Sequence, residues 1–544
     1  MQPVKQASQL FGVARRSAAT TARPVASHAG RRTNSTFRPP TPPSGPRPSV
    51  KQVGQSRPDT DRPPPPPPQP TSATPASPST APSRPAPSEL LTVLEETIKT
   101  HGPLAVPRFM TLCLNHPTLG YYTTRTVFGK EGDFVTSPEI SQVFGELLAV
   151  WYVTQWLAQG SPKRVRVVEL GPGRGTLLAD ILRTFRALPQ PSRPPISSIH
   201  LVEQSDQLKR VQKARLVETG FGETPVEWHA DVAAVPPSED EFTILIAHEF
   251  FDALPIHIFE NTQKGWREVL VDIADPKAII ASAKTHEPLR LVLAPGATPA
   301  SALYSSLAQA AFPNVVQAGH LQPDLNSAAA PVSKSTLTLN VDTTLGAPSR
   351  PSSSSPSSSA SPSAARAAPA SSPGGAGSLT AQRFARLPIG SRIEVSPSSW
   401  EVARDTARLV GGKAGGAGLV VDYGDAKAFG RSWRGFRKHQ VVDPLTEPGH
   451  TDLTANVDFS YLAESMSEFS STHGPLPQSR FLTSLGLQPR LAGLLRGAST
   501  DERRKEIESA AKRLVDQTGM GSQYKVMAVT PKGAKDVFPF DLVE

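Results

Sequence analysis

Three acidic residues and a glycine-rich loop stand in an order that can bind a nucleotide-like cofactor. Glu169 lies two residues before a loop whose glycines are Gly171, Gly173 and Gly175. Glycines carry no Cβ, so the backbone N–H groups of such a loop can approach a ligand closely. The helix expected to start at Thr176 adds partial positive charge.

Two further acids follow the next two apolar runs, Glu203 at the end of one and Asp231 shortly after the other. An acid at the position of Glu203 can accept both hydroxyls of a ribose, and Asp231 lies where an adenine ring is expected. The loop reads Gly-x-Gly-x-Gly and not the Gly-x-Gly-x-x-Gly of dinucleotide folds. Glu169 also suits the amino group of a sulfonium amino acid, so the spacing favours S-adenosylmethionine, with NAD as the alternative.

Short β-branched runs alternate with helical patterns around this loop. We expect strands at 165–170, 199–203, 243–248 and 418–424, with helices at 176–182, 206–216 and 400–410. This alternation predicts an α/β fold, a mostly parallel sheet with helices on both faces. In such sheets the ligand lies outside the carboxyl ends of the strands.

The helices expected before the first of these strands have recognisable start signals. Ser88 is placed to cap a helix that continues through Ile98. Ser137, Pro138 and Glu139 form a second start signal, followed by an apolar pattern that runs on to Trp151. The apolar stretch 143–158 predicts a helix with one buried face.

The 544-residue chain carries 57 prolines and a net charge of +9, but both are unevenly distributed. Residues 1–88 hold 12 basic and 2 acidic residues, and the remainder is close to neutral, so we do not expect a nucleic-acid partner. Residues 1–58 contain arginines and no acid, which is typical of a mitochondrial transit peptide. The single cysteine excludes a disulfide scaffold and a cysteine-based zinc site, and no metal site is predicted.

The composition divides the chain into segments. We expect a transit peptide at 1–38, a disordered Pro-rich linker at 39–88 and a low-complexity, mostly disordered insertion at 311–380. The folded body then comprises 89–310, with an N-terminal helical region, and 381–535, followed by a tail at 536–544. No apolar run is long enough for a transmembrane helix, so stable membrane insertion is not expected.

Several long motifs resemble the MidA-like family of SAM-dependent methyltransferases, and their order along the chain matches as well. They are Phe134–Ile140, Phe144–Leu147, Val168–Leu177, Ala247–Pro255, Asp422–Gly424, His450–Asp458 and Met520–Gly521. The resemblance implies a class I, Rossmann-like methyltransferase sheet with S-adenosyl-L-methionine as the cofactor. It also implies added N-terminal helices and inserted substrate-binding elements.

The mitochondrial branch of this family is a protein arginine methyltransferase that acts in complex I assembly. The resemblance therefore implies symmetric dimethylation, in the mitochondrial matrix, of an arginine of the 49-kDa-type core subunit of NADH:ubiquinone oxidoreductase. Two alternatives are a SAM-binding assembly chaperone without essential catalysis and a small-molecule methyltransferase. The oligomeric state is left open, with a homodimer as one option.

An arginine substrate calls for carboxylates, because they can hold the guanidinium plane and help to steer proton loss. Glu249 and Asp252 follow the expected strand 243–248, at the mouth where substrate must meet cofactor. We expect Glu249 to orient the substrate with Asp252 as its partner; the alternative for Asp252 is the capping of a local turn. Ser137, Glu139 and Phe251 are the candidates for substrate binding. Charge compensation at a helix start is the alternative for Glu139, and core packing is the alternative for Phe251.

Overall fold

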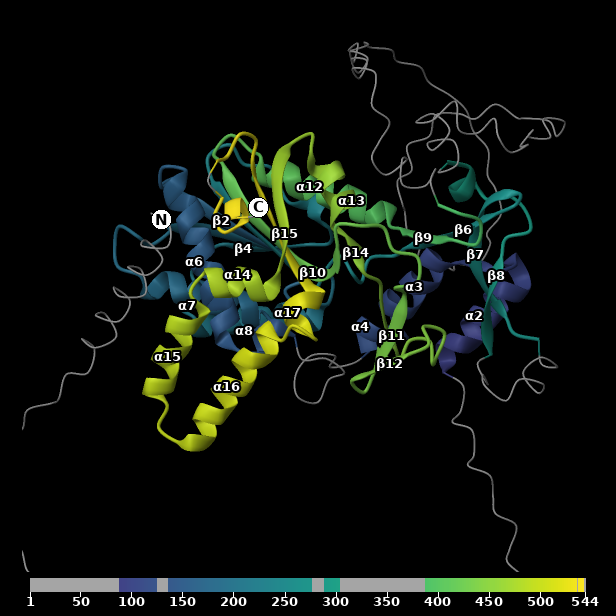
Figure 1. The fold of residues 1–544 in the computed structure, drawn as a ribbon, viewed down its shortest axis with the longest axis horizontal. Helices are drawn as coiled ribbons and strands as arrows, with labels where there is room; N and C mark the ends of the chain where they lie inside the picture. The colour runs from purple at the N-terminus through teal and green to yellow at the C-terminus, as the bar shows by residue number, and fades with distance from the viewer. Residues whose placement is uncertain (1–87, 125–135, 276–287, 304–386, 536, 543–544) are drawn as a thin grey trace, which may run out of the picture.

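The computed structural model describes residues 88–124, 136–275, 288–303, 387–535 and 537–542 (Figure 1). The expected transit peptide, all of the Pro-rich linker except Ser88 and the whole low-complexity insertion lie outside these residues. The described residues form two lobes (Figure 1). The larger lobe is a mixed sheet flanked by helices, and the smaller lobe is built around a second sheet. None of the described helices is long and apolar enough to cross a membrane.

The large sheet has the order β15-β16-β10-β5-β2-β3-β4, with β14 pairing beside β10. Six of its strands run parallel, since β2 pairs with β3 and β5, β3 with β4, and β10 with β5 and the short β14. The last two strands of the chain add antiparallel partners beyond β10. The strands are β2 (Val165–Leu170), β3 (Ile196–Val202), β4 (Val226–His229), β5 (Phe242–His248), β10 (Gly416–Asp425), β14 (Val457–Asp458), β15 (Ser470–Pro477) and β16 (Tyr524–Pro531).

Helices cover both faces of this sheet, which confirms the predicted α/β fold. One apolar core gathers α6 (Gln142–Ala158), α7 (Thr176–Ala187), α8 (Asp206–Glu218) and α14 (Gln478–Ser484) on one face. A second core packs α12 (Pro397–Val410), α13 (Phe459–Met466) and the turn η1 (Val232–Ala234) on the other face. Beside α14, a projecting pair of helices, α15 (Leu487–Gly497) and α16 (Asp501–Val515), leads through α17 (Met520–Gln523) into β16 (Figure 1).

The expected continuous helix from Pro138 to Trp151 is wrong. Ser141 has extended backbone angles, so the segment divides into α5 (Ser137–Ile140) and α6, and the Ser141 hydroxyl accepts a hydrogen bond from the Val143 N–H at 3.3 Å. Helix α6 is also buried on nearly every side and not on one face only. Its Glu146 is accommodated by a bidentate ion pair with Arg490 of α15, at 2.6 and 2.8 Å.

The second lobe consists mainly of the segments before β2 and between β5 and β10. Its sheet is antiparallel, with the order β1-β7-β6-β9 and β8 beside β7; the strands are β1 (Leu104–Ala105), β6 (His257–Thr262), β7 (Gly265–Ile273), β8 (Leu289–Leu293) and β9 (Arg392–Val395). Helices α2 (Glu89–His101), α3 (Val106–Asn115) and α4 (Tyr121–Thr124) share its core, and Ser88 caps α2 as predicted. A three-stranded sheet, β11 (Arg434–Arg437), β12 (Gln440–Val442) and β13 (Asp452–Thr454), completes the lobe. The last described residues form the 3-10 helix η3 (Phe540–Leu542).

Candidate active site

A cavity of about 770 Å³ lies at the carboxyl ends of β2, β3, β4 and β5, where the parallel sheet meets the second lobe. Its volume is in the range that small-molecule sites occupy. The large sheet contributes the glycine loop and the residues that follow β3, β4 and β5, whereas the second lobe contributes Tyr122, Phe436 and Asp452. The cavity therefore forms between the two lobes.

The glycine loop after β2 depends on backbone conformations that side chains rarely adopt. Gly171, Gly173 and Gly175 have φ angles of 60°, 51° and 73°, all in the left-handed region. A Cβ on Gly171 would also come within 2.9 Å of the Phe250 ring. Gly175 is the N-cap of α7, and Thr176 is the first residue of the helix and lines the cavity. The loop thus presents backbone and a helix start to the cavity, as predicted.

Glu169 is suited to a cationic ligand group. Only 3% of the residue is exposed, and among the described residues Oε2 finds no hydrogen-bond partner. Burial raises the pKa of this carboxyl to about 8. A buried acceptor without a partner is costly, and an ammonium group within reach would satisfy it. This orphaned oxygen on the wall of the cavity fits the amino group of S-adenosyl-L-methionine.

Glu203 and Asp231 line the same cavity beyond the glycine loop. Glu203 is fixed by the Ser205 N–H, at 2.8 Å, and by the side-chain amide of Gln212, at 3.2 Å. The same Gln212 amide nitrogen lies 2.8 Å from the carbonyl oxygen of Gly173, so one side chain ties the acid to the loop. Asp231 caps η1 by accepting the Ala234 N–H at 2.9 Å. The sequence gives no signal for Gln212, which lies within an ordinary helical pattern.

Glu249 follows β5 directly and has a strained backbone, with a φ angle of 50°. Strain of this kind persists only where the surroundings enforce it, and it clusters at functional sites. The Tyr524 hydroxyl donates to Glu249 Oε1 at 2.6 Å, and His248 Nε2 lies 3.6 Å from the same oxygen. Burial raises the pKa of Glu249 to about 8, although the Tyr524 hydrogen bond acts in the opposite direction. Burial also lowers the pKa of His248 to about 3, so the imidazole is neutral.

Asp252 lies on the cavity wall and pairs with the second lobe. Its Oδ2 accepts the Thr454 hydroxyl at 2.7 Å, and its backbone carbonyl accepts the Ala455 N–H. The loop that carries Asp252 is held by Asp422, whose Oδ2 accepts the N–H groups of residues 250, 251 and 252 at 3.2, 2.9 and 3.3 Å. Asp422 thus serves as the capping residue of this turn.

The three candidates for substrate binding occupy different places. Glu139 lines the cavity and raises the pKa of Glu249 by charge repulsion, which places the two carboxyl groups near one another. Ser137 is fully buried beside them, and its backbone hydrogen bond lowers the pKa of Glu249. Phe251 packs into the apolar core, and its neighbour Phe250 faces the cavity instead.

Two tyrosines lie beside Glu249. Tyr423, which belongs to the Asp422–Gly424 motif, lines the cavity, whereas no sequence pattern pointed to Tyr524. Tyr524 of β16 contacts Glu249, and Tyr423 of β10 packs against it with ring centroids 4.2 Å apart. Both belong to strands that pair antiparallel, at the register Tyr423 opposite Tyr524. Their approach to β5 depends on strand order, which no local pattern encodes.

Comparison with known proteins agrees with this geometry. The profile of a family described as "Putative S-adenosyl-L-methionine-dependent methyltransferase" matches residues 147–476. The protein named mitochondrial protein arginine methyltransferase NDUFAF7 is 33% identical in Mus musculus, over 80% of this chain and 82% of that protein. In Homo sapiens it is 31% identical, over 84% and 86%. A crystal structure from Burkholderia thailandensis, bound to S-adenosyl-homocysteine, has the same fold, with a TM-score of 0.56 and 21% identity over 83% of this chain and 94% of that one. The chain therefore belongs to this family of S-adenosyl-L-methionine-dependent methyltransferases.

Proposed function

We propose that this chain is a protein arginine methyltransferase, the activity for which its mouse and human relatives are named. The observation that carries the proposal is Glu249, a strained and buried carboxyl on the cavity wall whose pKa is raised to about 8. S-adenosyl-L-methionine supplies an electrophilic methyl group when it is bound. Glu169 and Glu203 would hold its amino and ribose groups, leaving Glu249 to face the substrate.

The acidic wall provides what a guanidinium group requires. Glu249, Glu139 and Asp252 all line the cavity, so a cationic side chain entering it would meet several carboxyl groups. Pairing with a cation favours the ionised carboxylate, which would lower the pKa of Glu249 from its raised value. Glu249 would then align the guanidinium plane and accept the proton that the reacting nitrogen releases, a task suited to a pKa near the working pH.

The resemblance extends the proposal to substrate and location. The relatives are named mitochondrial, and the acid-free leader independently supports import into that organelle. We therefore place the enzyme in the matrix, with the 49-kDa-type core subunit of NADH:ubiquinone oxidoreductase as its substrate and symmetric dimethylarginine as its product. A homodimer is the oligomeric state to be tested alongside.

Mass spectrometry of the 49-kDa-type subunit, after incubation with the full chain and labelled S-adenosyl-L-methionine, tests the proposal. We expect two methyl groups on one arginine, with fragmentation diagnostic of symmetric placement. The Glu249→Gln variant should retain cofactor binding by calorimetry and lose methyl transfer. Glu268→Gln is the control, because Glu268 is also a largely buried carboxyl, with 4% of its side chain exposed against 15% for Glu249, but it lies in β7 and does not line the cavity.

Three outcomes would contradict parts of the proposal. Full activity of Glu249→Gln would move the catalytic role to another residue. Bound cofactor without transfer by the unmodified chain would favour the assembly-chaperone alternative. Transfer to free metabolites and not to the subunit would make the chain a small-molecule methyltransferase.

A further inference from the structure

Three side chains of types that can bind a metal ion, two histidines and one glutamate, converge on one face of the large sheet at its β4 edge. His200 of β3 pairs in register with Glu227 of β4, and His229 stands two residues further along β4, so all three point to the same side. His200 Nδ1 and His229 Nε2 lie 3.1 Å apart, and Glu227 Oε2 lies 3.9 and 4.0 Å from these two nitrogens. None of the three lines the methyltransferase cavity.

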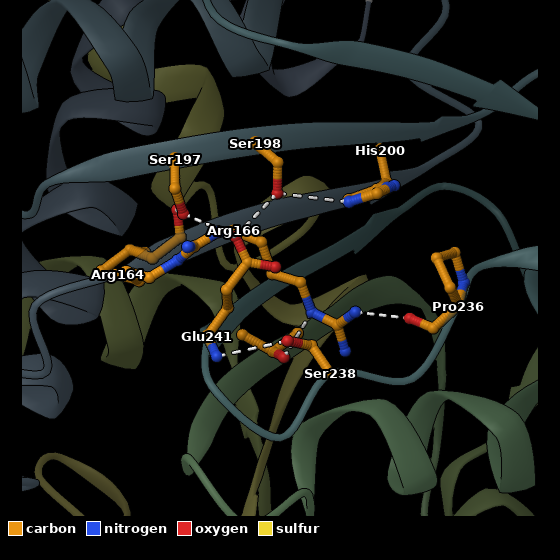
Figure 2. Close-up of polar contacts among 10 residues, drawn as sticks. Arg164, Arg166, Ser197, Ser198, His200, Pro236, Ser238 and Glu241 are labelled. Carbon is orange, nitrogen blue, oxygen red and sulfur yellow. Dashed lines mark hydrogen bonds and ion pairs between the residues drawn. The ribbon is translucent and has the colours of Figure 1, made fainter.

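A chain of hydrogen bonds sets the tautomer of His200. Figure 2 shows Ser198 between the Glu241 carboxylate and the His200 ring, with both contacts at 3.3 Å. The ionised carboxylate can only accept, so the Ser198 hydroxyl proton points toward Glu241, and Ser198 Oγ must accept from His200 Nε2–H. His200 Nδ1 therefore carries a lone pair, and this lone pair is directed toward His229 and Glu227. Metal-binding histidines are oriented by outer partners of this kind.

Two arrangements could hold the imidazole nitrogens 3.1 Å apart: a hydrogen bond between the rings, or a shared cation. Zinc bonds to nitrogen of about 2.0–2.1 Å in a tetrahedron place two ligand nitrogens about 3.3 Å apart, close to the observed separation. Glu227 lies nearly equidistant from both nitrogens, which a bond between the rings does not explain. Its side chain is 61% exposed, so it can swing inward from 3.9 and 4.0 Å to the tetrahedral edge of about 3.3 Å, a movement of about 0.6–0.7 Å.

The surrounding charges are compatible with a cation. Besides its partner His229, the charged groups that act on His200 are Glu227, Glu241 and Arg166, so two carboxylates oppose one guanidinium. Two imidazoles with one carboxylate suit Zn²⁺ and related transition metals, whereas Ca²⁺ and Mg²⁺ prefer oxygen ligands alone. The exposed side of the site leaves room for water as the fourth ligand.

We propose that His200, Glu227 and His229 form a Zn²⁺-class site that cross-links β3 to the edge strand β4. The site is separate from the methyltransferase cavity and does not depend on the proposed function. Because Asp231 follows His229 by two residues, the bound ion would also brace the turn that leads to the cofactor pocket.

Titration of the untagged full chain with Co²⁺, read by visible absorption, followed by displacement with Zn²⁺, tests this site. We expect one saturable equivalent with the intense bands of a tetrahedral centre. His229→Gln and Glu227→Gln should each weaken binding about tenfold or more, and Ser198→Ala, which removes only the orienting hydroxyl, about tenfold. His473→Gln is the control, because His473 lies in β15 at the opposite edge of the sheet.

Glu227→Gln changes an exposed side chain and keeps the test valid if His229→Gln does not fold. The proposal is overturned if no stoichiometric binding occurs. It is equally overturned if folded Glu227→Gln binds the metal as tightly as His473→Gln does, because the ion would then lie elsewhere.

Discussion

The Glu249→Gln substitution should stabilise the folded chain increasingly as the pH rises. The pKa of Glu249 is raised from 4.5 to about 8 in the folded protein, mainly by burial. Between these two pKa values the folded chain keeps a proton that the unfolded chain releases. Rising pH therefore stabilises the unfolded state relative to the folded state. The wild type therefore loses stability through this window, and glutamine, which does not titrate, removes that loss. Glutamine also retains an oxygen that can accept the Tyr524 hydroxyl.

The expected magnitude follows from the two pKa values. Each pKa unit corresponds to about 1.4 kcal/mol, and the transition flattens as the pH approaches the folded value. Between pH 6 and pH 8 the unfolding free energy of Glu249→Gln should therefore rise by about 2 kcal/mol relative to wild type. Urea unfolding of the cofactor-free chains at both pH values measures this difference.

Glu268→Gln provides a control of opposite sign. Burial acts to raise the pKa of Glu268, but hydrogen bonds from His257 and Thr298 prevail and hold it below the ordinary value. Such a carboxylate stabilises the fold above its unfolded pKa and loses this effect as the pH falls. Glu268→Gln should thus be less stable than wild type at both pH values, with no added gain at pH 8. An equal effect of Glu249→Gln at pH 6 and pH 8, or a loss of stability that grows with pH, would refute the reasoning.

Two further substitutions examine the cofactor loop and the tyrosine. Gly173→Val places a β-branched side chain at a φ of 51° beside the cavity. We expect S-adenosyl-L-methionine binding to disappear in calorimetry while the circular dichroism spectrum is retained. Unchanged affinity would exclude a role for the loop. Tyr524→Phe removes the hydrogen bond that lowers the pKa of Glu249. Since a hydrogen bond to a charged group is worth about 1.5–3 kcal/mol, the acid limb of kcat/KM should move up by about one to two pH units. Tyr152→Phe, which removes a buried hydroxyl bonded to a backbone carbonyl, should leave that limb in place; a shift in both variants or in neither would contradict this role for Tyr524.

Local patterns predicted the parallel strands because each is a short apolar run bounded by glycine, proline or a helix signal. The expected strand 165–170 coincides with β2, and the others differ from β3, β5 and β10 by a few residues at their ends. The glycine loop and Glu169 could also be predicted, because a strand, a turn and a helix that follow one another in the sequence fix their positions at the edge of the sheet. These features depend only on residues close to one another in the chain.

The rest of the site depends on contacts between distant segments. Tyr524 reaches Glu249 from 275 residues away, through the antiparallel pairing of β16 with β10. The facing of His200 and Glu227 depends on the register of β3 and β4, and a shift of one residue would turn one of them to the opposite face. The break at Ser141 interrupts an otherwise helical pattern, because this residue is extended and caps α6.

The residues that hold the loop after β5 lie late in the chain, so they are synthesised last. The loop after β5 needs the Asp422 carboxylate for three of its N–H groups, and the strained Glu249 needs Tyr524, near the end of the chain. A nascent chain that has emerged only as far as residue 300 can carry the glycine loop, Glu169 and the Ser137 backbone that contacts Glu249, but it lacks both Asp422 and Tyr524. The cavity wall around Glu249 can therefore mature only after the last strand docks, so a truncated product would retain the glycine loop without the complete cavity.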